Sequence, residues 1–260
     1  MRFLILSLGL AIAGAGAAPA AADNAPPQLS GIWEGPGFDL APSGHGGPGP
    51  VTNTSADIRQ PQGDYRNPIL KPWAATIVKH WADETRAGRA PLHPHALCLP
   101  TSVLGAMTLH GAYEFLQRPK EVTIIIANQT QARHIYLNVP HSNHVTPSWY
   151  GESVGHYEGD TLVVDTIGIK AGEFTPMDRF GTPHTDKLHI VERIRIANPK
   201  QLRIEYHVED PGAFTTPWNA RQHYHRAAEG PMREQACAEN NQTFFGYQVE
   251  PIPQAMKPDF

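Results

Sequence analysis

The chain has 260 residues, of which 40% are hydrophobic and 18% are charged, and its net charge is −4. This length suits one large domain or two small ones, and the apolar fraction is sufficient for a packed core. The near-neutral charge argues against a protein that holds nucleic acid through its phosphates, because it provides no large basic field.

The first 22 residues have the pattern of an export signal. Arg2 supplies a positive charge, residues 3–13 form an apolar run, and alanines at 20–22 precede Asp23. This run is shorter than the roughly 20 residues that span a bilayer, so we expect cleavage, with an uncleaved anchor as the alternative. We predict a periplasmic or secreted protein without a membrane partner after cleavage.

Residues 23–112 form an arm that is rich in glycine and proline. This composition predicts an irregular segment that lies over the rest of the domain. Within the arm, alternating residues over 29–34 predict a first strand, and apolar residues at helical spacing over 72–88 predict one helix. Pro72 begins this helix and Gly88 ends it, and we expect the helix to cover or plug a sheet.

From about residue 113 the apolar pattern has a period of two, which predicts strands with one dry and one wet face. We therefore predict that residues 113–260 form an antiparallel β body, in one domain with the arm, with the fold of a barrel or a curved sandwich. The predicted strands are Tyr113–Gln117, Glu121–Ala127, Arg133–Asn138, Ser153–Glu158, Asp160–Thr166, Lys187–Ile196, Gln201–Glu209 and Arg221–Arg226.

The two cysteines, Cys98 and Cys237, belong to a chain that we expect to enter an oxidising compartment. One disulfide between them is the simplest prediction, and two free thiols are the alternative. A thioredoxin-like role is not indicated, because neither cysteine belongs to a Cys-x-x-Cys pair.

Two groups of residues resemble known families. The Gly-Ile-Trp run at 31–33 resembles the Gly-x-Trp signature of lipocalins, whose tryptophan closes one end of a barrel, and this implies a lipocalin-like barrel. Residues 149–166, 178–184 and 237–241 are similar to a large family of exported bacterial β-rich proteins without assigned function, and the similarity covers most of residues 60–260. The second resemblance implies export and a β-rich fold, and it implies no activity.

The 14 histidines are the unusual feature of the composition, and several of them lie near carboxylates in the chain. Histidine exchanges a proton near neutrality, and a carboxylate on its far nitrogen fixes its tautomer. Such pairs in the mouth of a barrel would supply an acid and a base on opposite sides of a bound molecule. The candidate catalytic residues are His134, His156, Asp178, His184, His189 and Glu192, and the candidate substrate-binding residues are Tyr136, Tyr150, Tyr157 and Arg179.

The predicted strand that begins at Arg133 carries His134 and Tyr136 on one face, and we expect both side chains to point into the barrel together with Glu192. Glu192 lies on an apolar strand face, where a carboxylate is unfavourable unless it is paired. The alternative is a structural ion pair of Glu192 with Arg133 or Arg203.

Residues 175–186 form a long connection between two predicted strands, and binding groups concentrate in such loops. Arg179 would hold a carboxylate or polarise a carbonyl while Asp178 and His184 exchange a proton. The alternative is that Asp178 accepts hydrogen bonds from turn amides and pairs with Arg179.

Two further patterns lie near the predicted hairpin at residues 158–160. Tyr157 and Asp165 flank this hairpin, and we interpret them as cross-strand neighbours with a structural hydrogen bond. Residues 151–155 match the Gly-x-Ser-x-Gly pattern, but they lead into a predicted strand, whereas the nucleophile of that motif needs a strand-to-helix turn.

Other chemistries have less support. No nucleotide or flavin motif is present, so we expect no cofactor. A metal site is an alternative that uses histidines without their diagnostic spacing. The two possible ligand sets are His134 with His141 and His144, and His93 with His95 and His110.

The sequence therefore favours an exported, cofactor-free enzyme that uses histidine and carboxylate groups as base and acid. Its substrate would be a small apolar or aromatic molecule, and its reaction that of a lyase, an isomerase or a hydrolase. The alternative is a lipocalin-like protein that captures a small molecule in the barrel without turnover.

Overall fold

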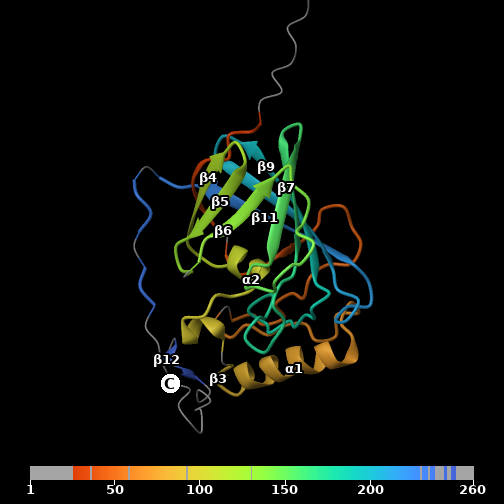
Figure 1. Cartoon of the computed structure of the whole chain (residues 1–260). Coiled ribbons are helices and arrows are strands. Elements are labelled where there is room, and N and C mark those ends of the chain that lie inside the picture. The colour runs from red at the N-terminus through yellow and green to blue at the C-terminus, as the bar shows by residue number, and fades with distance from the viewer. Residues whose placement is uncertain are drawn as a thin grey trace, which may run out of the picture.

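The computed structural model describes residues 26–249 except residues 36, 58, 92, 130, 229, 234, 238–242 and 245–246. Among these residues, nine strands form a closed, mixed β-barrel, with helices and loops below it (Figure 1). The predicted export signal lies outside the described residues. The strands follow one another around the barrel as β1 (Gly31–Glu34), β4 (Ala112–Arg118), β5 (Glu121–Ile126), β6 (Arg133–Leu137), β7 (Glu152–Glu158), β8 (Thr161–Ile167), β9 (His189–Asn198), β10 (Gln201–Glu209) and β11 (Trp218–Arg226).

The strand predictions are confirmed. Each of the strands predicted from residue 113 onward is present within a few residues of its predicted bounds, and β1 lies within the strand predicted over 29–34. The period of two also has its expected cause, because in β10 every second side chain, from Leu202 to Val208, is buried in the barrel.

The pairing of β6 with β7 corrects the prediction of an antiparallel body. These two strands run parallel, with Ile135 opposite Ser153 and Leu137 opposite Gly155. Residues 138–151, here called the crossover segment, return the chain to the other end of the barrel before β7 begins. A parallel neighbour requires such a return, whereas an antiparallel neighbour requires only a short turn.

The closure of the sheet excludes the curved sandwich. Strand β1 pairs with both β4 and β11, and Trp33 lies opposite Arg226. The Trp33 ring is fully buried, its Nε1 donates a hydrogen bond to the carbonyl of Leu29 at 3.0 Å, and the guanidinium of Arg226 lies 4.1 Å from the ring centroid. Arg226 thus covers the indole where the first and last barrel strands meet.

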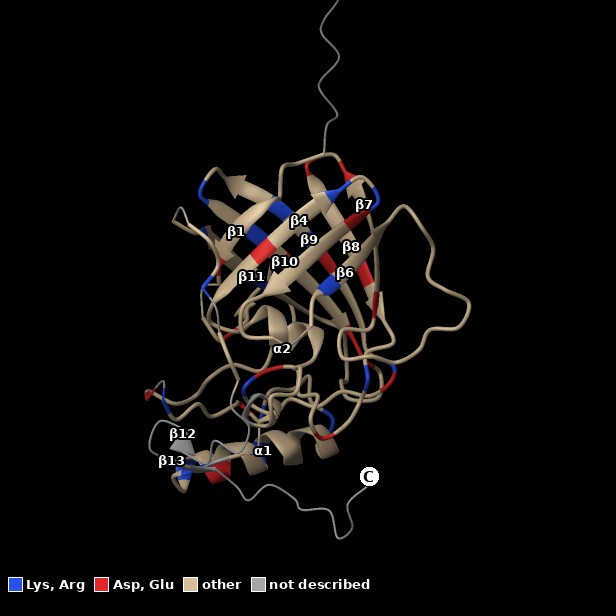
Figure 2. Ribbon diagram, turned by 60° about the vertical axis from the view of Figure 1, so that its left-hand side comes forward, with Lys and Arg blue, Asp and Glu red and all other residues tan. Residues whose placement is uncertain are grey.

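A short helix that the sequence did not predict, α2 (Val103–Met107), lies at one end of the barrel (Figure 2). All of its residues are buried, and Ser102 caps its first turn by accepting a hydrogen bond from the Gly105 amide. Tyr113 donates to the carbonyl of Ala106 at 3.0 Å, and Tyr224 donates to that of Met107. Helix α2 therefore takes the position that we expected for the predicted helix.

The predicted helix is present as α1 (Pro72–Arg86), but it packs on loops below the barrel (Figure 1). Its buried residues are Ala74, Val78 and Ala82, which lie four residues apart on one face. A methyl group added at Gly63 would lie 2.8 Å from Val78 and 2.7 Å from Phe180, which shows how closely the helix and two loops meet. Among the described residues, no helix combines the length and the hydrophobicity that a membrane crossing requires.

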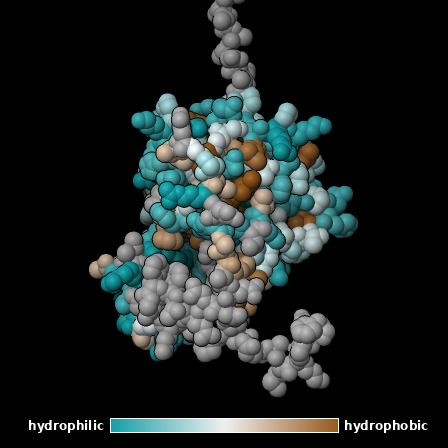
Figure 3. Space-filling model, turned by 90° about the vertical axis from the view of Figure 1, so that its left-hand side faces the viewer, coloured by the Kyte–Doolittle hydropathy of each residue, from teal (hydrophilic) through white to brown (hydrophobic). Residues whose placement is uncertain are grey.

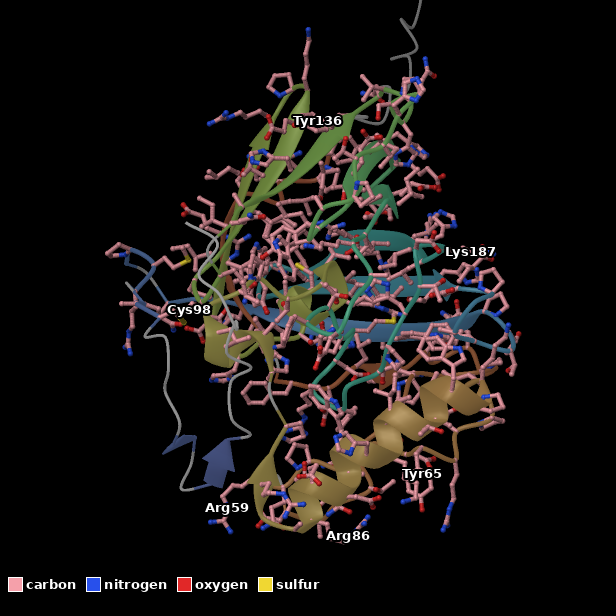
Figure 4. The ribbon with its side chains drawn as sticks, turned by 60° about the horizontal axis from the view of Figure 1, so that its bottom comes forward. Arg59, Tyr65, Arg86, Cys98, Tyr136 and Lys187 are labelled. Atoms are coloured by element: carbon pink, nitrogen blue, oxygen red, sulfur yellow. A yellow bond between two sulfur atoms is a disulfide. The ribbon has the colours of Figure 1, made fainter. Side chains whose placement is uncertain are left out.

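The remaining elements are small. The 3₁₀ helix η1 (Pro94–Leu97) precedes Cys98, and the predicted disulfide between Cys98 and Cys237 is confirmed, with Cα atoms 5.7 Å apart across a sequence separation of 139. Cys98 is labelled in Figure 4. Strand β2 (Ala41–Pro42) extends the sheet beside β11, and β3 (Arg89–Ala90) forms a small separate sheet with β12 (Thr243–Phe244) and β13 (Tyr247–Val249).

Large side chains of the protein occupy the barrel interior. Trp33, Tyr113, Phe115, Tyr206 and Tyr224 are fully or almost fully buried there. The expectation of a ligand site inside the barrel therefore requires correction, because these side chains take up the space that a ligand would need. The outer surface is mostly hydrophilic on the side that is at the left in Figure 1, with a small hydrophobic area among polar residues (Figure 3).

Candidate functional site

A groove with a volume of about 380 Å³ lies on the outside of the barrel, beside the parallel β6–β7 pair. Strand β6 supplies one wall and the crossover segment supplies the other. Figure 4 labels Tyr136, which lies on β6 and is 48% exposed. The polar and aromatic residues that line the groove include His134, Tyr136, Ser142, His144, Tyr150 and Glu152.

His134 is held in this groove by a carboxylate on the neighbouring strand. Strands β5 and β6 pair so that His134 is opposite Thr123, which brings Glu121 to one side of the imidazole. The Nδ1 atom of His134 lies 2.5 Å from Oε1 of Glu121, and its Nε2 has no hydrogen-bond partner among the described residues. The hydrogen bond from His134, followed by that from Thr123, lowers the pKa of Glu121. A carboxylate on Nδ1 leaves Nε2 available to accept a proton from a bound molecule.

Glu152, at the start of β7, supplies a second carboxylate to the groove. Ser142 donates to it twice, from its amide at 2.8 Å and from its hydroxyl at 2.6 Å, and Nδ1 of His141 lies 2.9 Å from Oε1. The hydroxyl of Ser142 contributes most to lowering the pKa of Glu152, so this group is an anion at neutral pH.

A row of alternating imidazoles and carboxylates continues from His141 across the outside of the barrel. Asp165 lies 3.0 Å from Nε2 of His141 and 3.1 Å from Nε2 of His189. Glu209 in turn lies 3.5 Å from Nδ1 of His189 and 3.1 Å from Nε2 of His207. Burial raises the pKa of Asp165, but the hydrogen bonds from the two histidines outweigh it and the net change is downward. Acidic positions on β7 and β8 are red in Figure 2.

The predicted site residues are distributed over several regions. His134, Tyr136 and Tyr150 line the groove, and His189 belongs to the outer row. Tyr150 is buried and donates to Gln129 at 3.0 Å, and burial raises its pKa. His156 lies outside the groove, where its Nε2 is 3.2 Å from Glu158 near the β7–β8 hairpin.

The prediction that His134 and Tyr136 share the barrel interior with Glu192 is wrong. In β6 the side chains of Arg133 and Ile135 point inward, so the alternation places His134 and Tyr136 outside. The alternative interpretation of Glu192 is confirmed, because it forms a buried ion pair with Arg133.

In the loop at residues 175–186, Asp178 stabilises a turn of the backbone. Asp178 accepts hydrogen bonds from the amides of Phe180 at 2.9 Å and Thr182 at 3.1 Å, and burial raises its pKa to about 6. The turn interpretation of Asp178 is therefore confirmed.

The two other residues predicted from this loop have separate surroundings. Arg179 pairs with Asp39 through two contacts of 2.7 Å, and not with Asp178. His184 is buried, its Nδ1 donates to the carbonyl of Thr185 at 2.9 Å, and its Nε2 lacks a partner among the described residues. Burial lowers the pKa of His184. No contact joins the three predicted residues in one cluster within the described part of the chain.

The β7–β8 hairpin and the residue before it contain both of the further patterns seen in the sequence. The predicted pairing of Tyr157 with Asp165 is wrong, because Tyr157 lies opposite Leu162, and Asp165 lies opposite Val154. The interpretation of the Gly-x-Ser-x-Gly match is confirmed. Ser153 points inward from a strand and is hydrogen-bonded to Arg133 at 3.2 Å, so this serine is not on a strand-to-helix turn.

The described residues contain no group of three or more histidine, cysteine, aspartate or glutamate side chains placed to hold a metal ion. Of one predicted set, His134 and His144 line the groove, whereas His141 contacts two carboxylates. Of the other set, His93 packs against Trp81, and His110 packs against Phe38.

Sequence reasoning missed Glu121 and did not assign roles to Ser142 and Glu152. The contact of Glu121 with His134 depends on the register of β5 against β6, which the six residues between the two strands do not specify. The signal that was present is the pair of histidines at 141 and 144, which lie in the crossover segment beside the groove.

Neither a protein-family model nor a curated protein matches this chain.

Proposed function

We propose that this protein is an exported enzyme, acting without a cofactor, that performs general acid–base chemistry on a small molecule bound in the groove beside β6 and β7. The observation that carries this proposal is the convergence on one groove of the His134–Glu121 pair and the carboxylate of Glu152. This groove replaces the barrel interior as the expected binding site, because large side chains occupy the interior.

The roles of the residues follow from their hydrogen bonds. His134 accepts a proton from the bound molecule at Nε2, and Glu121 stabilises the imidazolium that forms, because it is already on Nδ1. His144 on the crossover segment returns a proton from the other wall of the groove. Glu152 remains ionised and orients the molecule by accepting a hydrogen bond from it. This set of roles fits an elimination, an isomerisation or a hydrolysis.

The lining of the groove indicates the kind of substrate. The rings of His134 and Tyr136 are nearly parallel, with an interplanar angle of 16° and centroids 6.4 Å apart. No lysine or arginine is among the residues that line the groove, so an anionic molecule would lack a counter-ion. We infer an uncharged molecule with an aromatic or other ring that stacks on Tyr136, and with polar groups that face Ser142 and Ser148.

Export and a lipocalin-like architecture are parts of the same proposal. The signal pattern of the first 22 residues and the disulfide between Cys98 and Cys237 support an oxidising compartment. The buried Trp33, at the closure of the barrel, supports the resemblance to the Gly-x-Trp signature of lipocalins.

The test is turnover of a panel of p-nitrophenyl esters and p-nitrophenyl glycosides by the wild type and by His134→Gln. We expect the variant to lose about 10²-fold or more of kcat/KM on the substrate that is turned over, the usual contribution of a positioned base. His156→Gln is the matched control, because His156 also contacts a carboxylate and is similarly exposed, but outside the groove. Equal rates for the wild type and His134→Gln would refute the assignment.

Capture without turnover is the second candidate, and the openness of the groove favours it. Half of the His134 side chain is exposed, whereas acid–base groups gain most where water is excluded. In that case titration with p-nitrophenol would shift the NMR signals of Tyr136 and His134 in a saturable manner while the panel substrates remained intact.

A further inference from the structure

The crossover segment, residues 138–151, is a wall of the groove that is attached to the barrel at few points. At its ends, Asn138 donates from its amide to Gly155 at 2.8 Å, and Ser148 donates to Gly168 at 3.1 Å. Between these ends, the hydrogen bonds to the barrel come from His141 and its neighbour Ser142. Val145 also lies against Gly168. The hydrogen bonds that hold the middle of this wall therefore depend on what His141 and Ser142 contact.

His141 is placed between two carboxylates on different strands. Its Nδ1 lies 2.9 Å from Glu152 on β7, and its Nε2 lies 3.0 Å from Asp165 on β8. A neutral imidazole has one N–H and one lone pair, so it donates to only one of these oxygens. The lone pair of its other nitrogen would then point at a lone pair of a carboxylate oxygen, and two acceptors repel each other. Both contacts are favourable only when the ring carries two protons.

The charged groups around His141 are consistent with such an imidazolium. Glu152 and Asp165 face the ring, and the pKa values of both carboxyl groups are below their usual range. Farther along the row, His189 contacts the other side of Asp165, and Glu209 follows it. The nearest charged groups of the described residues that face the ring are thus anions, and His141 is 22% exposed, so water reaches the site where the proton exchanges.

We propose that His141 is a pH-operated latch, which holds the crossover segment against β7 and β8 while it is doubly protonated and releases one of the two strands when it loses a proton. The latched state binds one more proton than the released state, so latching is favoured at lower pH and lost as the pH rises. The two carboxylates, with their lowered pKa values, keep the latch closed to more acidic pH than ordinary carboxylates would. The inference rests on the proposed function only for its consequence, which is that the groove changes shape with pH.

The experiment follows the full mature chain by NMR between about pH 6 and about pH 8.5, a range in which histidine protonation changes. The first readout is the protonation of both ring nitrogens of His141, from 15N-histidine labelling assigned with His141→Gln. The second readout is exchange of the Ser142 amide, corrected for the intrinsic pH dependence of exchange. That amide reports on the wall because it donates to Glu152 at 2.8 Å.

We expect wild-type protection of the Ser142 amide to fall about tenfold or more as the ring loses its proton, because local opening controls this exchange. His141→Lys keeps a positive charge over the whole range and should remain protected at high pH. His141→Gln should show low protection that does not depend on pH, and His156→Gln should behave like the wild type.

The latch is refuted if one nitrogen of His141 is unprotonated while the Ser142 amide remains fully protected and the NMR signal of the Asp165 carboxyl group does not change, or if His141→Gln shows the wild-type pH dependence. His141→Lys is an additional test. If the lysine side chain does not fit between Glu152 and Asp165, the comparison of the wild type with His141→Gln decides the outcome. No substrate is involved, so failure of the latch leaves the proposed chemistry intact. Equal turnover by the wild type and His134→Gln, with a working latch, would instead refute only the proposed function.

Discussion

Two groups of paired basic and acidic side chains of the barrel differ in their contact with water. In the interior, Arg133 and Glu192 are each only 1% exposed, and Arg133 also donates to Ser153 and Thr166. On the outside, Asp165 is 42% exposed and contacts two histidines. The interior pair has no water to replace a lost partner, so it holds the fold. The outer row exchanges protons with solvent, so it is able to respond to pH. Position on the sheet decides which role the same chemical groups take.

Breaking the interior pair should have the largest effect. Glu192→Gln leaves the Arg133 guanidinium buried without a counter-ion, and we expect the free energy of unfolding to fall by about 3–5 kcal/mol. Urea denaturation, followed by far-UV circular dichroism, measures the change. In the double variant Arg133→Met with Glu192→Leu, the hydroxyls of Ser153 and Thr166 keep their own 2.8 Å contact, and most of the loss should be recovered. A loss below about 1 kcal/mol in the single variant would contradict the buried pair.

Asp178 sharpens the comparison, because it is a buried carboxylate that forms no ion pair with the described residues. Its pKa in the folded protein is raised to about 6 by burial, whereas the unfolded value is near 3.8. Between these values the folded state holds a proton that the unfolded state has lost, so stability falls as the pH rises from about 4 to about 7. We expect this carboxyl group to contribute a decrease of up to about 3 kcal/mol over that range.

The variant Asp178→Asn isolates this contribution. The asparagine oxygen still accepts the amides of Phe180 and Thr182, so the turn is preserved while the titration is removed. Urea denaturation at several pH values should show a smaller decrease in the variant than in the wild type. Asp186→Asn, an exposed change in the same loop, is the control and should retain the wild-type slope. Identical slopes for the wild type and Asp178→Asn would contradict the raised pKa.

A change in the outer row should have the smallest effect on stability. Asp165→Asn removes one anion between His141 and His189, and we expect a cost of about 0.5–1 kcal/mol at low salt that becomes smaller at high salt. Thermal denaturation at two salt concentrations measures it. We therefore expect a loss of unfolding free energy that is several times smaller than that caused by Glu192→Gln. A loss as large as that of Glu192→Gln, or one that salt does not change, would show that the row is a structural element like the interior pair.

Much of the fold could be predicted because strand patterns are local. The alternation in Gln201–Glu209 follows from the sequence with the observed bounds, and the helix follows from the proline at its start and from its apolar spacing. The parallel pairing of β6 with β7 could not be predicted, because it depends on the path of residues 138–151 through space. Helix α2 was missed because its five residues are too few for a periodic pattern.

The candidate site was less predictable than the fold. His134, Tyr136 and Tyr150 were identified as functional candidates, but on the assumption that the barrel would be hollow. The face to which a strand turns its side chains was misassigned in β6, where a buried arginine occupies an inward position and gives no apolar signal. Glu121 was not identified because its partner His134 is brought to it by strand register.

The sequence by itself determined the strand-rich class, the helix at Pro72 and the abundance of imidazole and carboxylate groups, because these depend on composition and on short-range periodicity. The export signal and the acid–base chemistry remain predictions. Only the tertiary structure decided that Glu192 is neutralised in the interior and that His141 lies between Glu152 and Asp165 outside. The physical reason is that closure and register of a sheet bring together residues that are distant in sequence, and no local pattern encodes those distances.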